Sequence, residues 1–285
     1  MRLACLALTC AALAVAAPSH AQSGEYRFTP KTNRPLTVYF HAPKRLAADT
    51  RVVFALHGLS RQGAATRDAW AAQADRFGFL VVTPHFDNVA YKGSANYSVG
   101  RVITRGERND PSTWTFAVID ELFDDIKARH GLRAVSYTLF GHSAGAQFAH
   151  RLAQLVPAAR VERVIAANAG WYTMMDGSQP YPWGLGGTGM QPADECRAFA
   201  RPMTILLGDL DTDPNHDQLN RDPGAMKQGL HRLARGQNFF AASRARAQAL
   251  GCRFAWTLNT APGIGHEFDK MAVAAAALLH DKEQQ

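Results

Sequence analysis

Short apolar runs rich in β-branched and aromatic residues alternate with helix-like segments along most of this 285-residue chain. The strand-like runs lie at 36–42, 51–58, 79–84, 135–142, 161–169, 203–209 and 253–259. The helix-like segments lie at 64–78, 112–131, 143–156, 239–250 and 269–280. Strands that alternate with helices pair mostly in parallel, so this order predicts an α/β fold with a mainly parallel central sheet and helices on both faces.

Two long segments interrupt this alternation. Residues 171–200 and 209–238 are rich in Gly, Pro, Asn and Asp, and we expect them to form long loops or a lid rather than a second domain. In the helix predicted at 112–131, Ser112 is the expected N-cap and Gly131 the expected stop.

The N-terminal residues have the layout of a secretory signal peptide. An early arginine precedes the apolar stretch 3–17, and a small-residue exit ends at Ala21. A transmembrane anchor needs roughly 20 apolar residues, and the short core and Pro18 disfavour it. We therefore expect a signal peptide at 1–21, one domain at 22–285, and a secreted or periplasmic location.

Removal of the signal peptide leaves two cysteines, Cys196 and Cys252. In an oxidising compartment this pair is expected to form a disulfide, with two buried free thiols as the alternative. The chain has neither a CxxC motif nor a His/Cys cluster with the spacing of a zinc site. We therefore expect no metal.

The formal net charge is +7 at pH 7. Such an excess favours anionic partners, among them acidic substrates, lipopolysaccharide and nucleic acid. The arginines are scattered, with no basic block interleaved with aromatic residues, so nucleic-acid binding is not expected. A solvated basic surface is the simpler explanation. Stable membrane insertion is not expected either, because no other stretch is long and apolar enough.

The strand-like run at 135–140 ends in GHSAG, which matches the pattern G-x-S-x-G. A serine on a tight turn between a strand and a helix points its hydroxyl out of the sheet, and the flanking glycines leave room for it. The helix that follows begins with free N–H groups, so the Ala144 amide is placed to stabilise an oxyanion. Ser143 is therefore the predicted nucleophile, and a purely structural turn is the alternative.

A second oxyanion donor is expected from the end of an earlier strand. His57 and Gly58 close the buried run at 51–58, which places the Leu59 amide toward Ser143. The His57 side chain is expected to brace this loop rather than act as a base.

A nucleophilic serine needs a base within hydrogen-bond reach. His266 lies in the glycine-containing segment TAPGIGHEFD, between the last strand-like run and the last helix. A loop there can bring its imidazole over Ser143, so His266 is the predicted base and His216 the alternative. His142 would point away from the hydroxyl, and His150 falls within the helix that follows it.

The acid that orients the base is expected in PMTILLGDLDTDP, at the end of the preceding strand-like run. Asp209, Asp211 and Asp213 compete there. The pattern Gly-x-x-Asp after the strand favours Asp211, and Asp213 is the second choice.

Aromatic residues follow the strand-like run at 161–169. Trp171, Tyr172 and Trp183 are candidates for substrate binding, because such side chains can floor an acyl or polymer-chain groove. Packing within the loop is the equal alternative.

The segments LHG, GHSAG, GDLDTDP and GIGHEF occur in the order expected of the α/β-hydrolase superfamily, which the chain resembles along nearly all of its mature length. Within it, the chain resembles secreted esterases related to polyhydroxybutyrate depolymerases, and also the type-1 poly(aspartic acid) hydrolases. The resemblance implies an α/β-hydrolase catalytic domain with Ser143 as nucleophile, His266 as base and Asp211 as acid. It also implies oxyanion amides at Leu59 and Ala144. Dedicated extracellular depolymerases often add a polymer-binding domain, which this chain lacks after His266, so soluble or short-chain substrates are expected.

We expect a serine hydrolase that cleaves carboxylic esters through an acyl-enzyme and needs no cofactor. A close alternative is hydrolysis of amide bonds in a polyanion such as poly(aspartic acid), which the basic charge would attract. A hydrolase-fold binding protein without catalysis is a third possibility, disfavoured by the presence of all three candidate groups.

Overall fold

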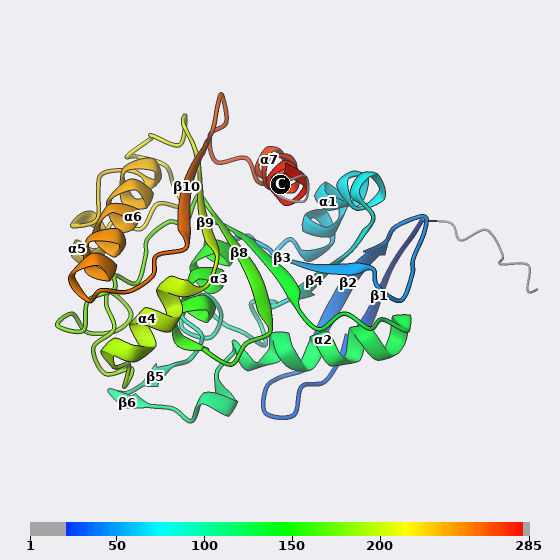
Figure 1. Ribbon diagram of the computed structural model, residues 1–285, viewed down its shortest axis with the longest axis horizontal. Helices are drawn as coiled ribbons and strands as arrows, with labels where there is room; N and C mark the ends of the chain where they lie inside the picture. Colours follow the sequence, from blue (N-terminus) through cyan, green and yellow to red (C-terminus); the bar gives the residue numbers. More distant parts are fainter. Residues whose placement is uncertain (1–20, 282–285) are drawn as a thin grey trace, which may run out of the picture.

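An eight-stranded sheet forms the centre of the computed structural model, which describes residues 21–281 (Figure 1). Its strands are β1 (Gln22–Phe28), β2 (Leu36–Ala42), β3 (Arg51–Leu56), β4 (Phe79–His85), β7 (Tyr137–His142), β8 (Val161–Ala167), β9 (Met203–Gly208) and β10 (Trp256–Ala261). They lie in the order β1-β2-β4-β3-β7-β8-β9-β10. All neighbours from β4 to β10 pair in parallel, whereas β2 is antiparallel to both β1 and β4. The predicted signal peptide falls almost entirely outside the described residues.

Helices cover both faces of this sheet (Figure 1). Helices α1 (Gly63–Phe77) and α7 (Phe268–Asp281) lie on one face, and α2 (Ala117–His130), α3 (Ala144–Leu155), α4 (Pro192–Ala200) and α6 (Arg232–Ala249) on the other. The remaining short elements are β5 (Ile103–Thr104), β6 (Glu107–Arg108), η1 (Pro111–Thr113) and α5 (Pro223–Met226). The predicted mainly parallel sheet with helices on both faces is therefore confirmed.

Each central strand contributes to two hydrophobic cores. Val53 and Phe140 pack with α1 and α7, while Phe54 and Leu139 pack with the helices of the opposite face. Successive side chains of a strand point to opposite faces, so a strand covered on both sides is apolar throughout. This explains why β3 and β7 read as uninterrupted apolar runs.

The structure corrects one predicted helix start. Helix α2 begins at Ala117, and Ser112 lies instead in η1, where Asp110 accepts a hydrogen bond from the Ser112 amide (2.8 Å). The turn Asp110-Pro111 starts a separate short helix, because an aspartate followed by proline makes a good helix start of its own. Gly131 ends α2 as predicted, with φ of 64°.

Three other elements depart from the predicted pattern. Helix α6 starts at Arg232, seven residues before the predicted start at 239, and β1 and α4 were not predicted. The first turns of α6 are polar and contain Gly236, and β1 is an edge strand whose side chains are mostly exposed or half-buried. Neither segment therefore carries the apolar period on which sequence recognition depends.

A disulfide joins Cys196 in α4 to Cys252, just after α6, as predicted. It links two elements on the same face of the sheet. Disulfides persist in oxidising compartments, so this bond is consistent with one. Within residues 21–281, no helix combines the length and apolarity needed to cross a bilayer.

Candidate active site

Ser143 occupies the turn between β7 and α3. Its backbone has φ of 55° and ψ of −115°, outside the regions that non-glycine residues ordinarily adopt. The flanking glycines make this turn possible: a Cβ on Gly141 would lie 2.1 Å from the Gly145 carbonyl oxygen, and one on Gly145 would lie 2.3 Å from that of Leu56. The chain is thus folded tightly enough at this point to lift the serine hydroxyl out of the sheet.

Two loops from other strands bring a histidine and an aspartate to this serine. His266, in the loop after β10, places Nε2 3.1 Å from Ser143 Oγ. Asp211, in the loop after β9, places Oδ2 2.7 Å from His266 Nδ1. Serine hydroxyl, imidazole and carboxylate form one hydrogen-bonded chain, the arrangement required for proton transfer from the serine.

The other two candidate aspartates make local contacts instead. Asp209 Oδ1 accepts a hydrogen bond from the Gly263 amide (2.7 Å), and Asp213 Oδ1 accepts one from the Asn215 amide (2.8 Å). Only Asp211, among the three, contacts His266.

Asn168, which was not among the predicted site residues, connects the two loops. Its side chain donates to the Gly265 carbonyl (2.7 Å) and accepts from the Gly208 amide (2.8 Å). One amide side chain thus holds the residue before His266 against the end of β9. Asn168 falls near the end of the strand-like run predicted at 161–169, and β8 ends just before it at Ala167. A polar residue at a strand end was a signal that it could serve the site.

The Asp211 carboxylate is 3% exposed and is bound on its other side by Arg232, whose Nη1 lies 3.2 Å from Oδ1. Burial alone would raise the pKa of Asp211, but the hydrogen bond from His266 and the charges of His266 and Arg232 outweigh it. The pKa of Asp211 therefore lies below its ordinary value, and the carboxylate is ionised at neutral pH.

Burial lowers the pKa of His266, and the positive charge of Arg232 lowers it further, against the opposing effect of Asp211. The imidazole is therefore neutral at pH 7. A neutral imidazole whose Nδ1 proton is held by Asp211 has a free lone pair on Nε2 for the serine proton.

The remaining histidines near the site have structural partners. His57 accepts a hydrogen bond from the Phe86 amide at Nε2 (3.1 Å) and contacts the Gly58 carbonyl through Nδ1 (3.1 Å), and burial lowers its pKa to about 3. It braces the loop after β3, as expected. His150 Nε2 accepts a hydrogen bond from the Thr173 amide (3.1 Å) within the core. The ring of His142 packs 4.6 Å from that of His266, and His216 contacts Arg232 rather than Ser143.

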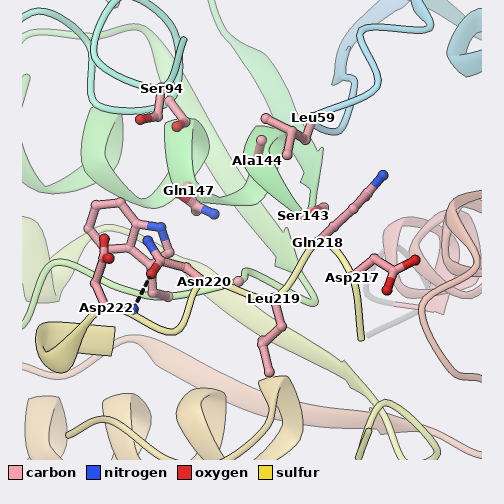
Figure 2. Close-up of a pocket in the computed structure, with 13 residues that line it drawn as sticks. Leu59, Ser94, Ser143, Ala144, Gln147, Asp217, Gln218, Leu219, Asn220 and Asp222 are labelled. Carbon is pink, nitrogen blue, oxygen red and sulfur yellow. Dashed lines mark hydrogen bonds between the residues drawn. The ribbon is translucent and has the colours of Figure 1, made fainter. Parts of the chain in front are cut away.

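The two predicted oxyanion residues line a cavity of about 410 Å³ together with Ser143 (Figure 2). Ala144 is the first residue of α3, so its N–H has no partner within the helix. The loop after β3 passes close to the serine, since a Cβ on Gly58 would lie 3.6 Å from Ser143 Cβ. Leu59, the next residue, is thereby held at the mouth of the cavity.

Of the three predicted aromatic contacts, only Trp171 lines this cavity. Trp183 packs against the Trp171 ring, with ring centroids 4.4 Å apart, but lines a different cavity of about 620 Å³. Tyr172 is fully buried and stacks on Phe239 at 4.4 Å, so the prediction that it contacts substrate is wrong. Tyr172 belongs instead to the hydrophobic core.

Polar residues missed in the sequence form most of the cavity wall. Gln147 lies one turn after Ser143 on α3, so it could have been found from helical spacing. Asp217, Gln218, Asn220 and Asp222 come from one irregular loop, for which the sequence offers no period (Figure 2). A second, smaller cavity of about 120 Å³ adjoins Ser143 and is lined by His266.

Solved structures of other proteins share this architecture. Poly(aspartic acid) hydrolase-1 from Sphingomonas sp. KT-1 is 41% identical, with a TM-score of 0.88 over 90% of this chain and 97% of that one. A poly(3-hydroxybutyrate) depolymerase from Bordetella parapertussis is 36% identical, with a TM-score of 0.88 over 92% and 90% of the two chains. The chain belongs to the α/β-hydrolase superfamily.

This α/β-hydrolase also shares its fold with more distant enzymes. S-formylglutathione hydrolase from Agrobacterium tumefaciens is 16% identical, with a TM-score of 0.59 over 93% of this chain and 95% of that one. No protein-family model and no curated protein sequence matches the chain. The predicted superfamily and the two resembled enzyme groups are confirmed by the structural comparison. Within residues 21–281 of the hydrolase, no three His, Cys, Asp or Glu side chains form a group that could hold a metal ion.

Proposed function

We propose that this protein is a serine hydrolase that cleaves carboxylic esters through an acyl-enzyme. The hydrogen-bonded chain Ser143–His266–Asp211, at the junction of two cavities, carries the proposal. His266 takes the serine proton as Ser143 Oγ attacks the ester carbonyl carbon. The amides of Leu59 and Ala144 stabilise the oxyanion, and His266 then donates the proton to the leaving alcohol. Water, activated by His266, releases the acid and restores the serine.

The two cavities suggest where each half of the ester lies. His266 must protonate the leaving alcohol, and it lines the smaller cavity of about 120 Å³. The acyl group is therefore placed in the larger cavity of about 410 Å³. Six of the 13 residues that line it carry hydroxyl or amide side chains, which suits an acyl chain with its own ester or hydroxyl groups better than a long alkyl chain. The similarity to a poly(3-hydroxybutyrate) depolymerase supports a short oligomer of hydroxy acids as substrate.

Hydrolysis rates on a matched panel test this proposal. Short and long nitrophenyl esters and hydroxybutyrate oligomers would be compared, with Ser143→Ala as the inactive control. We expect kcat/KM to be highest for short polar acyl groups and to vanish in Ser143→Ala. An enzyme that prefers long alkyl esters would contradict the assigned acyl chemistry, and activity in Ser143→Ala would contradict the nucleophile.

Hydrolysis of amide bonds in a polyanion is the second candidate. The 41% identity to poly(aspartic acid) hydrolase-1 and the net charge of +7 favour it. The cavity wall opposes it, because the lining includes Asp217 and Asp222 but no lysine or arginine. Added salt separates the two: screening should slow the attack on poly(aspartate) strongly and leave a neutral ester almost unaffected.

Export to the periplasm or the outside of the cell is part of this proposal. The Cys196–Cys252 disulfide supports it, since such bonds are rare in reducing compartments. Cell fractionation of the full-length chain would test it, and recovery of the protein in the cytoplasm only would contradict it.

A further inference from the structure

Arg232 is a buried cation on the far side of the carboxylate that binds His266. It is the first residue of α6 and is 1% exposed. Its Nη1 lies 3.2 Å from Asp211 Oδ1, while Asp211 Oδ2 accepts a hydrogen bond from His266 Nδ1. The two carboxylate oxygens are thus divided between guanidinium and imidazole, so Asp211 cannot rotate without losing one of its partners.

His216 meets the same guanidinium. Its Nδ1 lies 3.3 Å from Arg232 Nη2 and 3.1 Å from the Gln218 amide nitrogen. A guanidinium and an amide N–H can only donate, so Nδ1 must carry a lone pair and the ring proton lies on Nε2. His216 Nδ1 therefore accepts hydrogen bonds from both sides.

These contacts connect the cavity wall to the catalytic groups. Gln218 lines both cavities beside Ser143 and follows His216 by two residues. From it, the contacts run through His216 and Arg232 to Asp211. In Figure 2, Gln218 lies next to Ser143, at the point where this loop approaches the serine.

We propose that Arg232 and His216 are positioning residues that hold the Asp211 carboxylate toward His266 and couple it to the substrate-lining loop at 213–222. The inference rests on the proposed function, because it concerns the same Ser143 site. Neither side chain lines the cavities around Ser143, so both would act through other residues rather than on substrate.

The proposal has a pH signature. The groups that face His266 are Asp211 and His216 from the loop after β9, Arg232 from α6 and His142 from β7. Of these, the guanidinium holds a fixed positive charge that opposes protonation of His266. Removing it should raise the pKa of His266, so the acid limb of kcat/KM should move to higher pH.

Arg232→Gln and Arg232→Lys test the inference, with Arg246→Gln as the control on the same helix. Arg246 lies in the last turn of α6, at the opposite end from Arg232, and pairs with Glu195 (2.8 Å). We expect Arg232→Gln to lower kcat on the order of 100-fold, to leave KM nearly unchanged, and to move the acid limb upward. Arg232→Lys should keep the acid limb near its original pH because it keeps the charge. Arg246→Gln should change neither quantity.

His216→Ala provides a second variant if Arg232→Gln does not fold. It removes the acceptor for Arg232 and for the Gln218 amide, so kcat should fall and KM should rise as the loop loosens. In the double variant His216→Ala/Arg232→Lys, the losses should be less than additive, because the two residues act on one carboxylate. Additive losses in the double variant would overturn the inference. Wild-type kinetics in both single variants, His216→Ala and Arg232→Lys, would overturn it as well.

The pKa of His266, followed by NMR, separates this inference from the proposed function. A raised pKa in Arg232→Gln supports the role of Arg232 even if the wild type hydrolyses no tested ester. An active wild type with the same His266 pKa and kcat as Arg232→Gln would overturn the role of Arg232 and leave the serine mechanism intact.

Discussion

Ser143 has a backbone conformation that few residues other than glycine adopt, and two glycines make the space for it. Strain of this kind persists only where surrounding structure enforces it, and it often marks functional positions. At the residue scale, the site thus depends as much on absent side chains as on present ones.

Gly145→Ala should therefore destabilise the protein. The added Cβ would lie 2.3 Å from the Leu56 carbonyl oxygen, a contact that only backbone movement can relieve. We expect a loss of about 3 kcal/mol in the free energy of unfolding, measured by urea denaturation. Gly177→Ala is the matched control, because its Cβ would meet nothing within 4 Å. Equal stability of the two variants would contradict the tight turn.

Asp211→Asn should leave the fold intact and reduce kcat by about 10³- to 10⁴-fold. The amide can present its NH₂ group to Nδ1, which then carries no proton and leaves the wrong tautomer facing Ser143. Asp213→Asn is the control, since Asp213 bonds only its own loop. Steady-state kinetics on a nitrophenyl ester would measure kcat for both variants. A larger loss of kcat in Asp213→Asn than in Asp211→Asn would make Asp213 the acid.

Site residues at strand ends could be predicted from the sequence, whereas those on irregular loops could not. Ser143, Asp211 and His266 each follow a recognisable apolar run, so the meeting of their strand ends could be anticipated. Arg232 could not be anticipated, because the first turns of α6, which contain it, are polar and show no apolar period. The loop with Gln218 has no period at all, and its path depends on tertiary contacts such as that of His216 with Arg232.

At the scale of elements, the site is assembled from loops at the carboxyl ends of β3, β7, β9 and β10. The chain runs from β3 to β4 on one side and returns to β7 on the other, which opens a crevice between the ends of β3 and β7. Leu59 and Ser143 flank that crevice. The elements predicted least well, β1 and α4, contribute nothing to this edge.

The disulfide offers a test at this scale. Cys196 and Cys252 are separated by 56 residues in sequence, and closing such a loop stabilises a fold by about 4 kcal/mol in the chain-entropy model. Cys196→Ser/Cys252→Ser should lose about this much in urea denaturation while kcat stays unchanged, because the catalytic loops follow other strands. The same loss should appear when the wild type is reduced. Coinciding denaturation midpoints would contradict a structural role for the bond.

At the scale of the whole molecule, one sheet carries a hydrophobic core on each face, and the candidate site lies at the carboxyl ends of its strands. The architecture could be predicted because buried parallel strands leave long apolar signals, and the superfamily because four motifs occur in the expected order. The acyl-group preference could not be predicted from the sequence, because it depends on a cavity wall built from loop residues. At this scale, we infer that the assembled fold makes one serine hydroxyl nucleophilic.

Intact-mass spectrometry of the folded protein after treatment with a fluorophosphonate would show whether Ser143 is nucleophilic. We expect a single adduct, located on Ser143, that is absent in Ser143→Ala and forms far more slowly in His266→Ala. A folded wild-type protein that stays unmodified, or a Ser143→Ala variant modified at the wild-type rate, would contradict this expectation.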